Sequence, residues 1–280
     1  MAHSPAFRRL HPELEPRERR QALQRSSPPA SVVHEAIRHE GLVELERAPA
    51  ALGWSGLAAG LSMGFSLVVA GLLQSHLPAH EWRPLVAKLG YSVGFVIVIL
   101  GRQQLFTENT LTPILPLLTR PDAPTFGKVA RLWAIVLAAN LVGALAFALA
   151  VAFLPVFEPP ALVAFDEIAS VSMGGTSLEH FVQGVFAGWL IALMIWMLPM
   201  SGANRVVVIV LLTYVIALGK LTHVVAGAVE VFYAVARGSS QAVDAARWIG
   251  ATLAGNVLGG LALTAALNHA QVKAKSGGGG

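Results

Sequence analysis

The sequence contains no cysteine and few charged residues. Without cysteine, the chain can form neither disulfide bonds nor thiolate metal sites. Only 13% of its 280 residues are charged and 55% are hydrophobic, a share well above that of ordinary soluble domains. The alternative, a soluble all-helical protein, fits this composition poorly. The sequence therefore predicts an integral membrane protein.

Six apolar segments are long enough to cross a bilayer, which takes about 20 residues of helix. These segments are 54–73, 89–118, 129–153, 181–199, 206–233 and 247–267. We therefore expect an all-α membrane protein with six transmembrane helices, in a channel domain that covers residues 51–270.

The first fifty residues differ from the rest because they are rich in arginine and proline. The arginines are Arg8, Arg9, Arg17, Arg19, Arg20, Arg25, Arg38 and Arg47. Residues 1–30 have the composition of a disordered basic tail, and residues 31–47 have the pattern of an amphipathic helix on the membrane surface. No apolar core follows the early arginines, so we expect no cleaved signal peptide. Residues 1–50 are interpreted as a basic arm, and 271–280 as a tail that ends in an appended Ser-Gly linker.

The positive charges are distributed unevenly between the two sides of the membrane. With six spans, both termini lie on one side, together with fourteen lysines and arginines, whereas the loops on the other side hold four. The positive-inside rule then places both termini in the cytoplasm, at a bacterial inner membrane. This asymmetry accounts for the net charge of +4 without a nucleic-acid partner.

The third and sixth spans share a sequence motif. In each, an arginine lies nine residues before an Asn-Leu-Val-Gly or Asn-Val-Leu-Gly segment. Arg131 and Asn140 match Arg247 and Asn256, at an offset of 116 residues. The same offset matches LFTENTLTP (105–113) of the second span with GKLTHVVAG (219–227) of the fifth, and so Thr107 with His223. Three spans repeated once insert with opposite orientations, which predicts two inverted three-helix repeats in an aquaporin-like architecture.

The two polar stretches are expected to break the second and fifth helices. Backbone at membrane depth leaves a helix only where it is buried in protein or lines a wet cavity. Pro113 cannot donate a backbone hydrogen bond. Glu108 or Lys220 would each cost about 2.5–3.5 kcal/mol or more if it faced lipid at the bilayer centre. A simple kink is the alternative for one break alone, but two breaks at equivalent positions favour a permeation path between them.

Four charged residues near the breaks form a candidate charge relay. Lys220 lies three residues before His223, where an unpaired ammonium is costly. We expect it to pair with Glu108, or else with Glu230, with Arg102 in the same group. A lysine that points into the pore instead would attract anions.

The motifs resemble those of the formate/nitrite transporter family of pentameric anion channels. The resemblance covers about residues 50–270, and its most specific pieces are LFT (105–107), NLVGAL (140–145), the break at His223 and GNVLGGL (255–261). It implies a homopentamer in the lipid bilayer with one pore in each protomer.

The resemblance also implies which residues form the pore. Thr107 and His223 would be its polar centre, with Leu105 and Phe106 in the cytoplasmic constriction. Further candidates for the pore lining, for which ordinary helix packing is an equal alternative, are Tyr91, Phe95 and Ile216.

Several family residues are absent. The usual Phe-Glu-His-Ser-x-x-Asn stretch reads Leu-Thr-His-Val-Val-Ala-Gly here (221–227), and the lysine usually found before the fourth span has no counterpart near 176–180. The chain thus resembles a divergent branch of the family.

The function implied by the resemblance is the transport of small monovalent anions of weak acids, linked to protons at His223. Three alternatives remain open. A water or glycerol channel would need paired Asn-Pro-Ala turns, which the sequence lacks. A membrane enzyme would need a cluster of ligands or paired carboxylates, and none of the nine histidines forms a His-x-x-x-His pair within a span. A non-conducting scaffold is compatible with the lost polar residues. We expect no chemical conversion, no cofactor and no bound metal.

Overall fold

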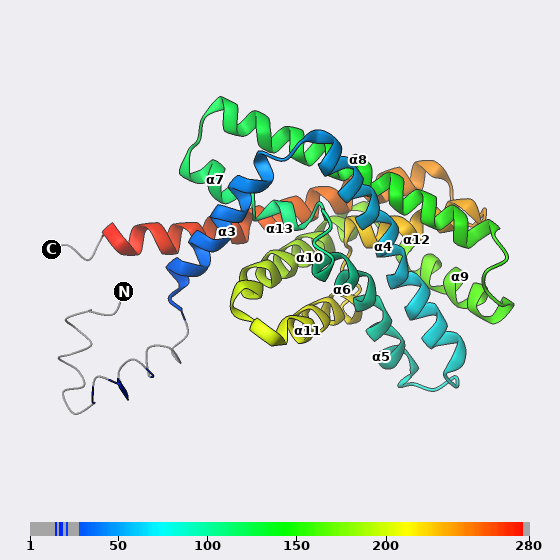
Figure 1. Cartoon of the computed structure of the whole chain (residues 1–280). Helices are drawn as coiled ribbons and strands as arrows, with labels where there is room; N and C mark the ends of the chain where they lie inside the picture. Colours follow the sequence, from blue (N-terminus) through cyan, green and yellow to red (C-terminus); the bar gives the residue numbers. More distant parts are fainter. Residues whose placement is uncertain (1–14, 16, 19–20, 22–27, 277–280) are drawn as a thin grey trace.

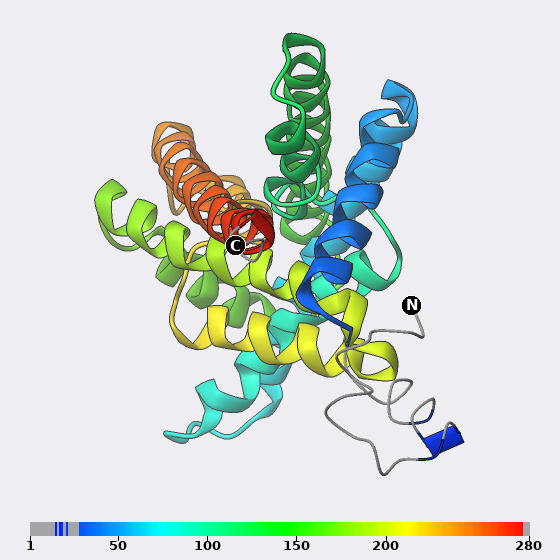
Figure 2. The same cartoon turned by 90° about the vertical axis from the view of Figure 1, so that its left-hand side faces the viewer.

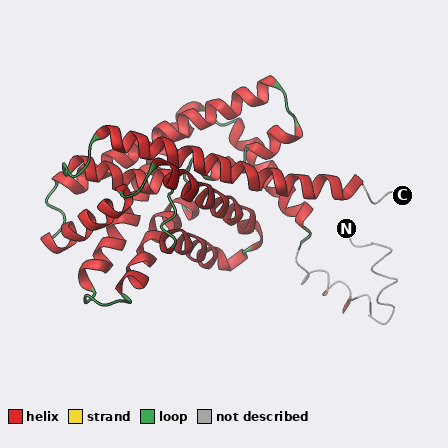
Figure 3. Ribbon diagram, turned by 180° about the vertical axis from the view of Figure 1, so that it is seen from behind, coloured by secondary structure: helices red, strands yellow, loops and turns green. Residues whose placement is uncertain are grey.

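The structure is a computed structural model that describes the backbone of residues 15, 17–18, 21 and 28–276, with side chains as far as residue 267. The described part is helical and contains no strand, as Figure 3 shows. Five helical stretches are long and apolar enough to span a membrane, and two shorter apolar helices accompany them. The predicted all-α membrane fold is therefore confirmed. Residues 1–14, 16, 19–20 and 22–27 of the basic arm lie outside the described residues.

The helices form two sets of equivalent elements (Figure 1). The first set is α4 (Pro49–His76), α5 (Arg83–Ala87), η1 (Lys88–Tyr91), α6 (Ser92–Leu100), η2 (Glu108–Thr110), α7 (Ile114–Thr119) and α8 (Ala123–Phe153). The second set is α10 (Ser177–Met197), η3 (Leu198–Met200), η4 (Gly202–Asn204), α11 (Arg205–Leu218), α12 (Val224–Ala236) and α13 (Ala242–Ser276). The second and fifth spans are thus each divided into two helical parts, as the polar stretches predicted.

The long helices begin where the sequence supplies caps. Asp122 accepts a hydrogen bond from the backbone N–H of Thr125 at 2.8 Å and starts α8. Thr176 and Glu179 form a capping box at the start of α10. The backbone N–H and the side chain of Thr176 both bond to the Glu179 carboxylate.

Glycines let the long helices approach each other closely. A Cβ at Gly60 of α4 would lie 2.2 Å from the backbone oxygen of Asn140 in α8. A Cβ at Gly188 of α10 would lie 2.2 Å from the backbone oxygen of Asn256 in α13. The two helix pairs therefore make the same close contact. In a bilayer such contacts between small residues are stabilised by van der Waals packing, because the hydrophobic effect does not favour helix association there.

Helix α9 (Pro159–Met173) was not predicted. It has only 15 residues and carries Asp166 and Glu167, so it is too short and too polar for the span pattern. Its inner face nevertheless packs on α4 and α12, and Phe165 lies edge-on to Tyr233 with ring centroids 6.1 Å apart. The helix thus completes the wall of the channel domain.

Helix α3 (Ala30–Leu45) forms where the amphipathic pattern predicted a helix, but its apolar side chains face protein. Val33, Ile37 and Leu45 are buried, and a Cβ at Gly41 would meet the backbone oxygen of Thr112 at 2.1 Å. Figures 1 and 2 show α3 crossing the channel domain beside α7. The helix therefore packs directly on the broken second span, and its position at the membrane surface stays a prediction.

Candidate pore site

Both broken helices end in the same way. Helix α6 ends at Gly101 and α11 at Gly219, and each glycine is followed by a basic residue with a left-handed backbone. The φ angles are 51° for Arg102 and 52° for Lys220, and among the described residues no other non-glycine position has a positive φ. The chain then continues without helix to Thr107 in the first half and to His223 in the second.

One asparagine holds each break in place. The Asn140 side chain accepts a hydrogen bond from Phe106 N at 2.9 Å and donates to the oxygens of Gly56 and Gln104, both at 2.8 Å. The Asn256 side chain accepts from Val224 N at 2.8 Å and donates to two equivalent oxygens, those of Gly184 and Thr222, at 2.9 Å. Each amide thus pairs two backbone groups that the broken helix leaves without a helical partner, and it ties them to a carbonyl of the first helix of the same repeat.

These hydrogen bonds correct the predicted register of the repeat. The two asparagines are 116 residues apart, but their backbone partners Phe106 and Val224 are 118 apart. Arg102 and Lys220 are also 118 apart. Applying 116 to the breaks was therefore wrong by two residues, because the second half has two fewer residues between its break and the asparagine of its third helix. The residue equivalent to His223 is Leu105.

Thr107 and His223 meet at the centre, although they are not repeat equivalents. Thr107 Oγ1 lies 2.7 Å from His223 Nε2, and both residues are buried. Ala226 N–H donates to His223 Nδ1 at 3.1 Å and caps the start of α12. Since Nδ1 is an acceptor, the neutral ring carries its proton on Nε2 and donates it to Thr107. The threonine hydroxyl proton then remains free for another acceptor.

Apolar side chains surround this polar pair. Leu105 and Phe106 are 0% and 2% exposed, and the Phe106 ring lies edge-on to Trp133 at 5.6 Å. The Phe95 ring lies edge-on to the imidazole of His223 at 4.9 Å, and Tyr91 lies 5.3 Å from Phe95. The centre is therefore excluded from bulk water.

Two cavities approach the centre from its two sides. The Lys220 cavity has about 660 Å³ and is lined by Lys88, Tyr91, Ile216, Lys220, His223 and Glu230 among others. The α3 cavity has about 680 Å³ and is lined by Glu40, Glu44, Arg102, Glu108, Asn109 and Arg205 among others. The Thr107–His223 pair lies between the His223 wall of one cavity and the Glu108 wall of the other.

The expected ion pair between Lys220 and Glu108 is wrong, because the two residues line different cavities. Arg102 also bonds elsewhere, to Glu40 of α3 at 2.5 Å. Glu230 accepts a hydrogen bond from the Ser172 hydroxyl in the Lys220 cavity, so it shares that cavity with Lys220 without an ion pair in the described residues. The four charged residues therefore do not form one cluster.

Comparison with known proteins identifies the family of this chain. The family model described as "Formate/nitrite transporter" matches residues 31–270. The Inner membrane protein YfdC of Escherichia coli (strain K12) is 45% identical over 246 residues, which are 87% of this chain and 79% of that protein. The chain belongs to the formate/nitrite transporter family.

Solved structures show the family fold at low sequence identity. One described as "FNT family ion channel" is 18% identical with a TM-score of 0.73, and the match covers 84% of this chain and 96% of that chain. A second, "Pentameric formate channel with formate bound", is 18% identical with a TM-score of 0.58, over 82% and 94%. This family member therefore keeps the fold despite the substitutions around His223.

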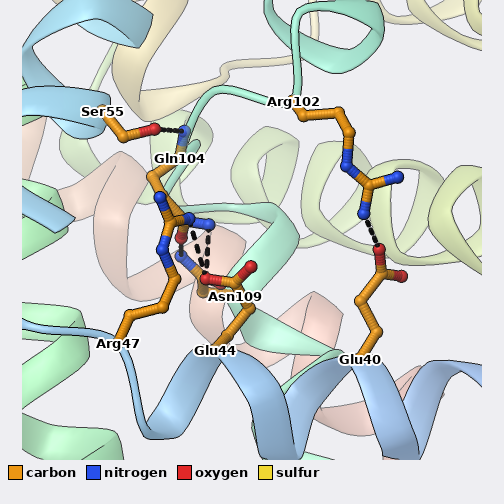
Figure 4. Close-up of polar contacts among 7 residues, drawn as sticks. All are labelled: Glu40, Glu44, Arg47, Ser55, Arg102, Gln104 and Asn109. Atoms are coloured by element: carbon orange, nitrogen blue, oxygen red, sulfur yellow. Dashed lines mark hydrogen bonds and ion pairs between the residues drawn. The ribbon is translucent and has the colours of Figure 1, made fainter. Parts of the chain in front are cut away.

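The break in the first half of this family member is also held by α3 (Figure 4). Glu44 accepts hydrogen bonds from Gln104 Nε2 at 2.8 Å and from Arg47 at 3.1 Å. The Gln104 side chain accepts from Asn109 at 3.2 Å, and its backbone N–H donates to Ser55 at 3.1 Å. Since Gln104 and Asn109 bracket residues 105–108, these contacts close the loop that carries the constriction and Thr107.

Sequence reasoning missed the roles of Asn140, Asn256, Glu44 and Gln104. The two asparagines belong to the repeated sequence motif. An amide at the same position of both halves, inside an apolar span, was the signal for such a role, because a buried amide needs hydrogen-bond partners. No sequence signal linked Glu44 to Gln104, because that contact depends on where α3 crosses the channel domain.

Proposed function

We propose that this chain is a membrane channel or transporter for small monovalent anions of weak acids, such as formate or nitrite, with a proton supplied or relayed by His223. The observation that carries the proposal is the Thr107–His223 contact between two cavities. Membership of the family supports it, as does the likeness to a structure described as a formate channel.

The chemistry follows from the apolar surroundings of the pair. An anion that leaves a wet cavity loses its hydration, and this cost is large in a dry constriction. The Thr107 hydroxyl donates a hydrogen bond to the anion. His223 takes up a proton from the cavity water at Nδ1, which breaks the bond to Ala226, and the resulting imidazolium passes its Nε2 proton to the anion, leaving a neutral ring and the neutral acid. The neutral acid then crosses the constriction at Leu105 and Phe106, which the anion does not. Glu108 lies in the wall of the α3 cavity and Glu230 in the wall of the Lys220 cavity. Each carboxyl can pass a proton from the cavity to the ring.

The proposed assembly is a homopentamer in a bacterial inner membrane, with one pore in each protomer and both termini in the cytoplasm. The description of a similar structure as pentameric and the name of the E. coli relative support this. Large apolar side chains on the outside of the single chain also support it, since Trp54 is 74% and Phe186 60% exposed. In this orientation the α3 cavity opens to the cytoplasm and the Lys220 cavity to the opposite side.

The test is transport by purified protein in proteoliposomes, with formate, nitrite, acetate, lactate and chloride offered in turn and internal pH followed with a dye. We expect wild type to carry at least one weak-acid anion with protons. His223→Phe should fold and lose this flux by at least about tenfold, because no proton donor remains. His76→Phe, at a histidine exposed outside the site, is the matched control and should behave as wild type.

Two results would overturn the proposal. If His223→Phe transports at the wild-type rate with an unchanged pH profile, the central histidine is structural. If wild type moves none of the anions but passes water or glycerol in light-scattering experiments, the chain is a neutral-solute pore.

A further inference from the structure

The left-handed basic residues stand out because both breaks have one at the same place. A non-glycine residue is strained in this backbone conformation, and glycine adopts it freely. Glycine does occur one residue earlier in each half, at Gly101 and Gly219, where the backbone has ordinary helical angles. Strain retained twice at equivalent positions, with a basic side chain each time, points to a function of the side chains.

The Lys220 side chain is exposed in its cavity and has no hydrogen-bond or ion-pair partner among the described residues. A second ammonium, that of Lys88, lines the same cavity and donates to Leu218 O at 3.4 Å. Both carboxylates of this cavity bond to neutral groups. Glu167 accepts from Gln74 at 2.5 Å, and Glu230 accepts from Ser172. The Lys220 ammonium therefore keeps its donors for an anion beside His223.

Arg102 has the opposite surroundings. Its guanidinium donates to Glu40 of α3 at 2.5 Å, as Figure 4 shows. Arg205 also lines the α3 cavity, but three carboxylates line it as well, those of Glu40, Glu44 and Glu108. The cation of this break is thus neutralised by a helix that lies outside the two repeats.

We propose that Arg102 and Lys220 are a pair of anion-collecting cations, one at each mouth of the pore, and that Glu40 masks Arg102 while α3 is docked. The proposal rests on the proposed function, because it assigns the residues that bring the anion to the Thr107–His223 pair. Anions should enter faster from the Lys220 cavity than from the α3 cavity. Loss of the Glu40 contact should reduce this difference.

The first experiment compares Lys220→Gly with Lys220→Arg in oriented vesicles, where anion entry is measured from each side at low and at high salt. Lys220→Gly should reduce entry from its own side about tenfold at low salt and have little effect at 1 M salt, where screening acts within about 3 Å. Its thermal stability should equal or exceed that of wild type, since glycine relieves the backbone strain. Lys220→Arg should keep the flux. Arg83→Gln, on the same side but outside the cavity lining, is the control.

The second experiment tests the mask. Glu40→Gln should raise low-salt entry from the α3 side several-fold, and adding Arg102→Gly should abolish the increase. Unchanged entry in Lys220→Gly at low salt would overturn the assignment of Lys220. Unchanged entry in Glu40→Gln would overturn the masking of Arg102.

A readout without transport separates this proposal from the proposed function. Trp248 lines the Lys220 cavity, so iodide and caesium can be used as quenchers of its fluorescence once the other five tryptophans are replaced by phenylalanine. Quenching by iodide should fall in Lys220→Gly at low salt, and quenching by caesium should rise. This result would support the cation even if no anion were transported. Equal quenching in wild type and variant would contradict it even if transport were found.

Discussion

The two breaks use the same backbone design for different purposes. In each, a helix ends at glycine, a basic residue turns the chain, and an asparagine from the third helix binds three backbone groups. Beyond this, the first break is fastened to α3 through Gln104 and Glu44, whereas the second is fastened within its own repeat by the Thr222 hydroxyl on His180 O at 2.7 Å. The first break is therefore open to influence from α3.

The equivalent positions also carry different chemistry. Leu105 of the first half corresponds to His223 of the second, so one half supplies an apolar constriction where the other supplies the group that binds a proton. Thr107 reaches His223 from two residues further along the chain. The symmetric backbone of the two repeats thus positions the site. Because equivalent positions carry different side chains, the second half supplies a polar group and the first half an apolar one.

The largest expected effect is the loss of either asparagine. Asn140→Ala and Asn256→Ala each leave two buried backbone groups of the break without the amide that pairs them, at about 1–3 kcal/mol for each group. Both variants should lose several kcal/mol of stability. Asn256→Ala should lose more, because the single Thr222–His180 hydrogen bond then holds the second break, whereas both Ser55 and Glu44 still hold Gln104 in the first half. Thermal unfolding in mild detergent measures this. Wild-type melting of either variant would show that its amide does not hold the break.

Smaller losses are expected where the helix pairs cross. Gly60→Ala and Gly188→Ala each place a methyl group 2.2 Å from a backbone oxygen, which forces α4 from α8 or α10 from α13. Overpacking of this kind costs about 1–3 kcal/mol, and the two variants should melt at similar temperatures. Gly127→Ala in α8 is the control, because nothing lies within 4 Å of its Cβ position. A large difference between the two variants would mean that the halves are not packed alike.

The smallest effect is expected at the contact that distinguishes the halves. Glu44→Ala frees Gln104 and Asn109, so the loop that carries Leu105 and Phe106 should loosen. We expect a stability loss of about 1 kcal/mol and a two- to fivefold gain in the flux of larger anions relative to formate. Glu35→Ala is the matched control, because Glu35 is an exposed carboxylate of α3 whose one partner among the described residues is Arg38. Equal selectivity in both variants would contradict a positioning role for Glu44.

Most of the fold was predictable because its causes are local in the sequence. Apolar length gives the spans, and polar residues within them give the breaks. The charge partners were not predictable: Lys220 was assigned to Glu108, but the twist of each break turns the two residues toward opposite cavities. The register error of two residues has a similar origin, since the sequence match aligned the helices and not the chain between them. Helix α9 carried no span signal, because its packing uses a single face.

The short connection between α3 and α4 limits how far α3 can move from the pore. Only residues 46–48 separate the two helices, and Lys128 of α8 holds this turn by donating to Glu46 at 2.5 Å, which lowers the pKa of that carboxyl. A tether this short keeps the effective concentration of α3 at its docking surface very high. A separate peptide copy of α3 would therefore compete poorly, and dilution would leave docking unchanged. A signal that releases α3 has to act on the contacts themselves, through the charge of Glu40 or Glu44 or through a pull on the arm that precedes the helix.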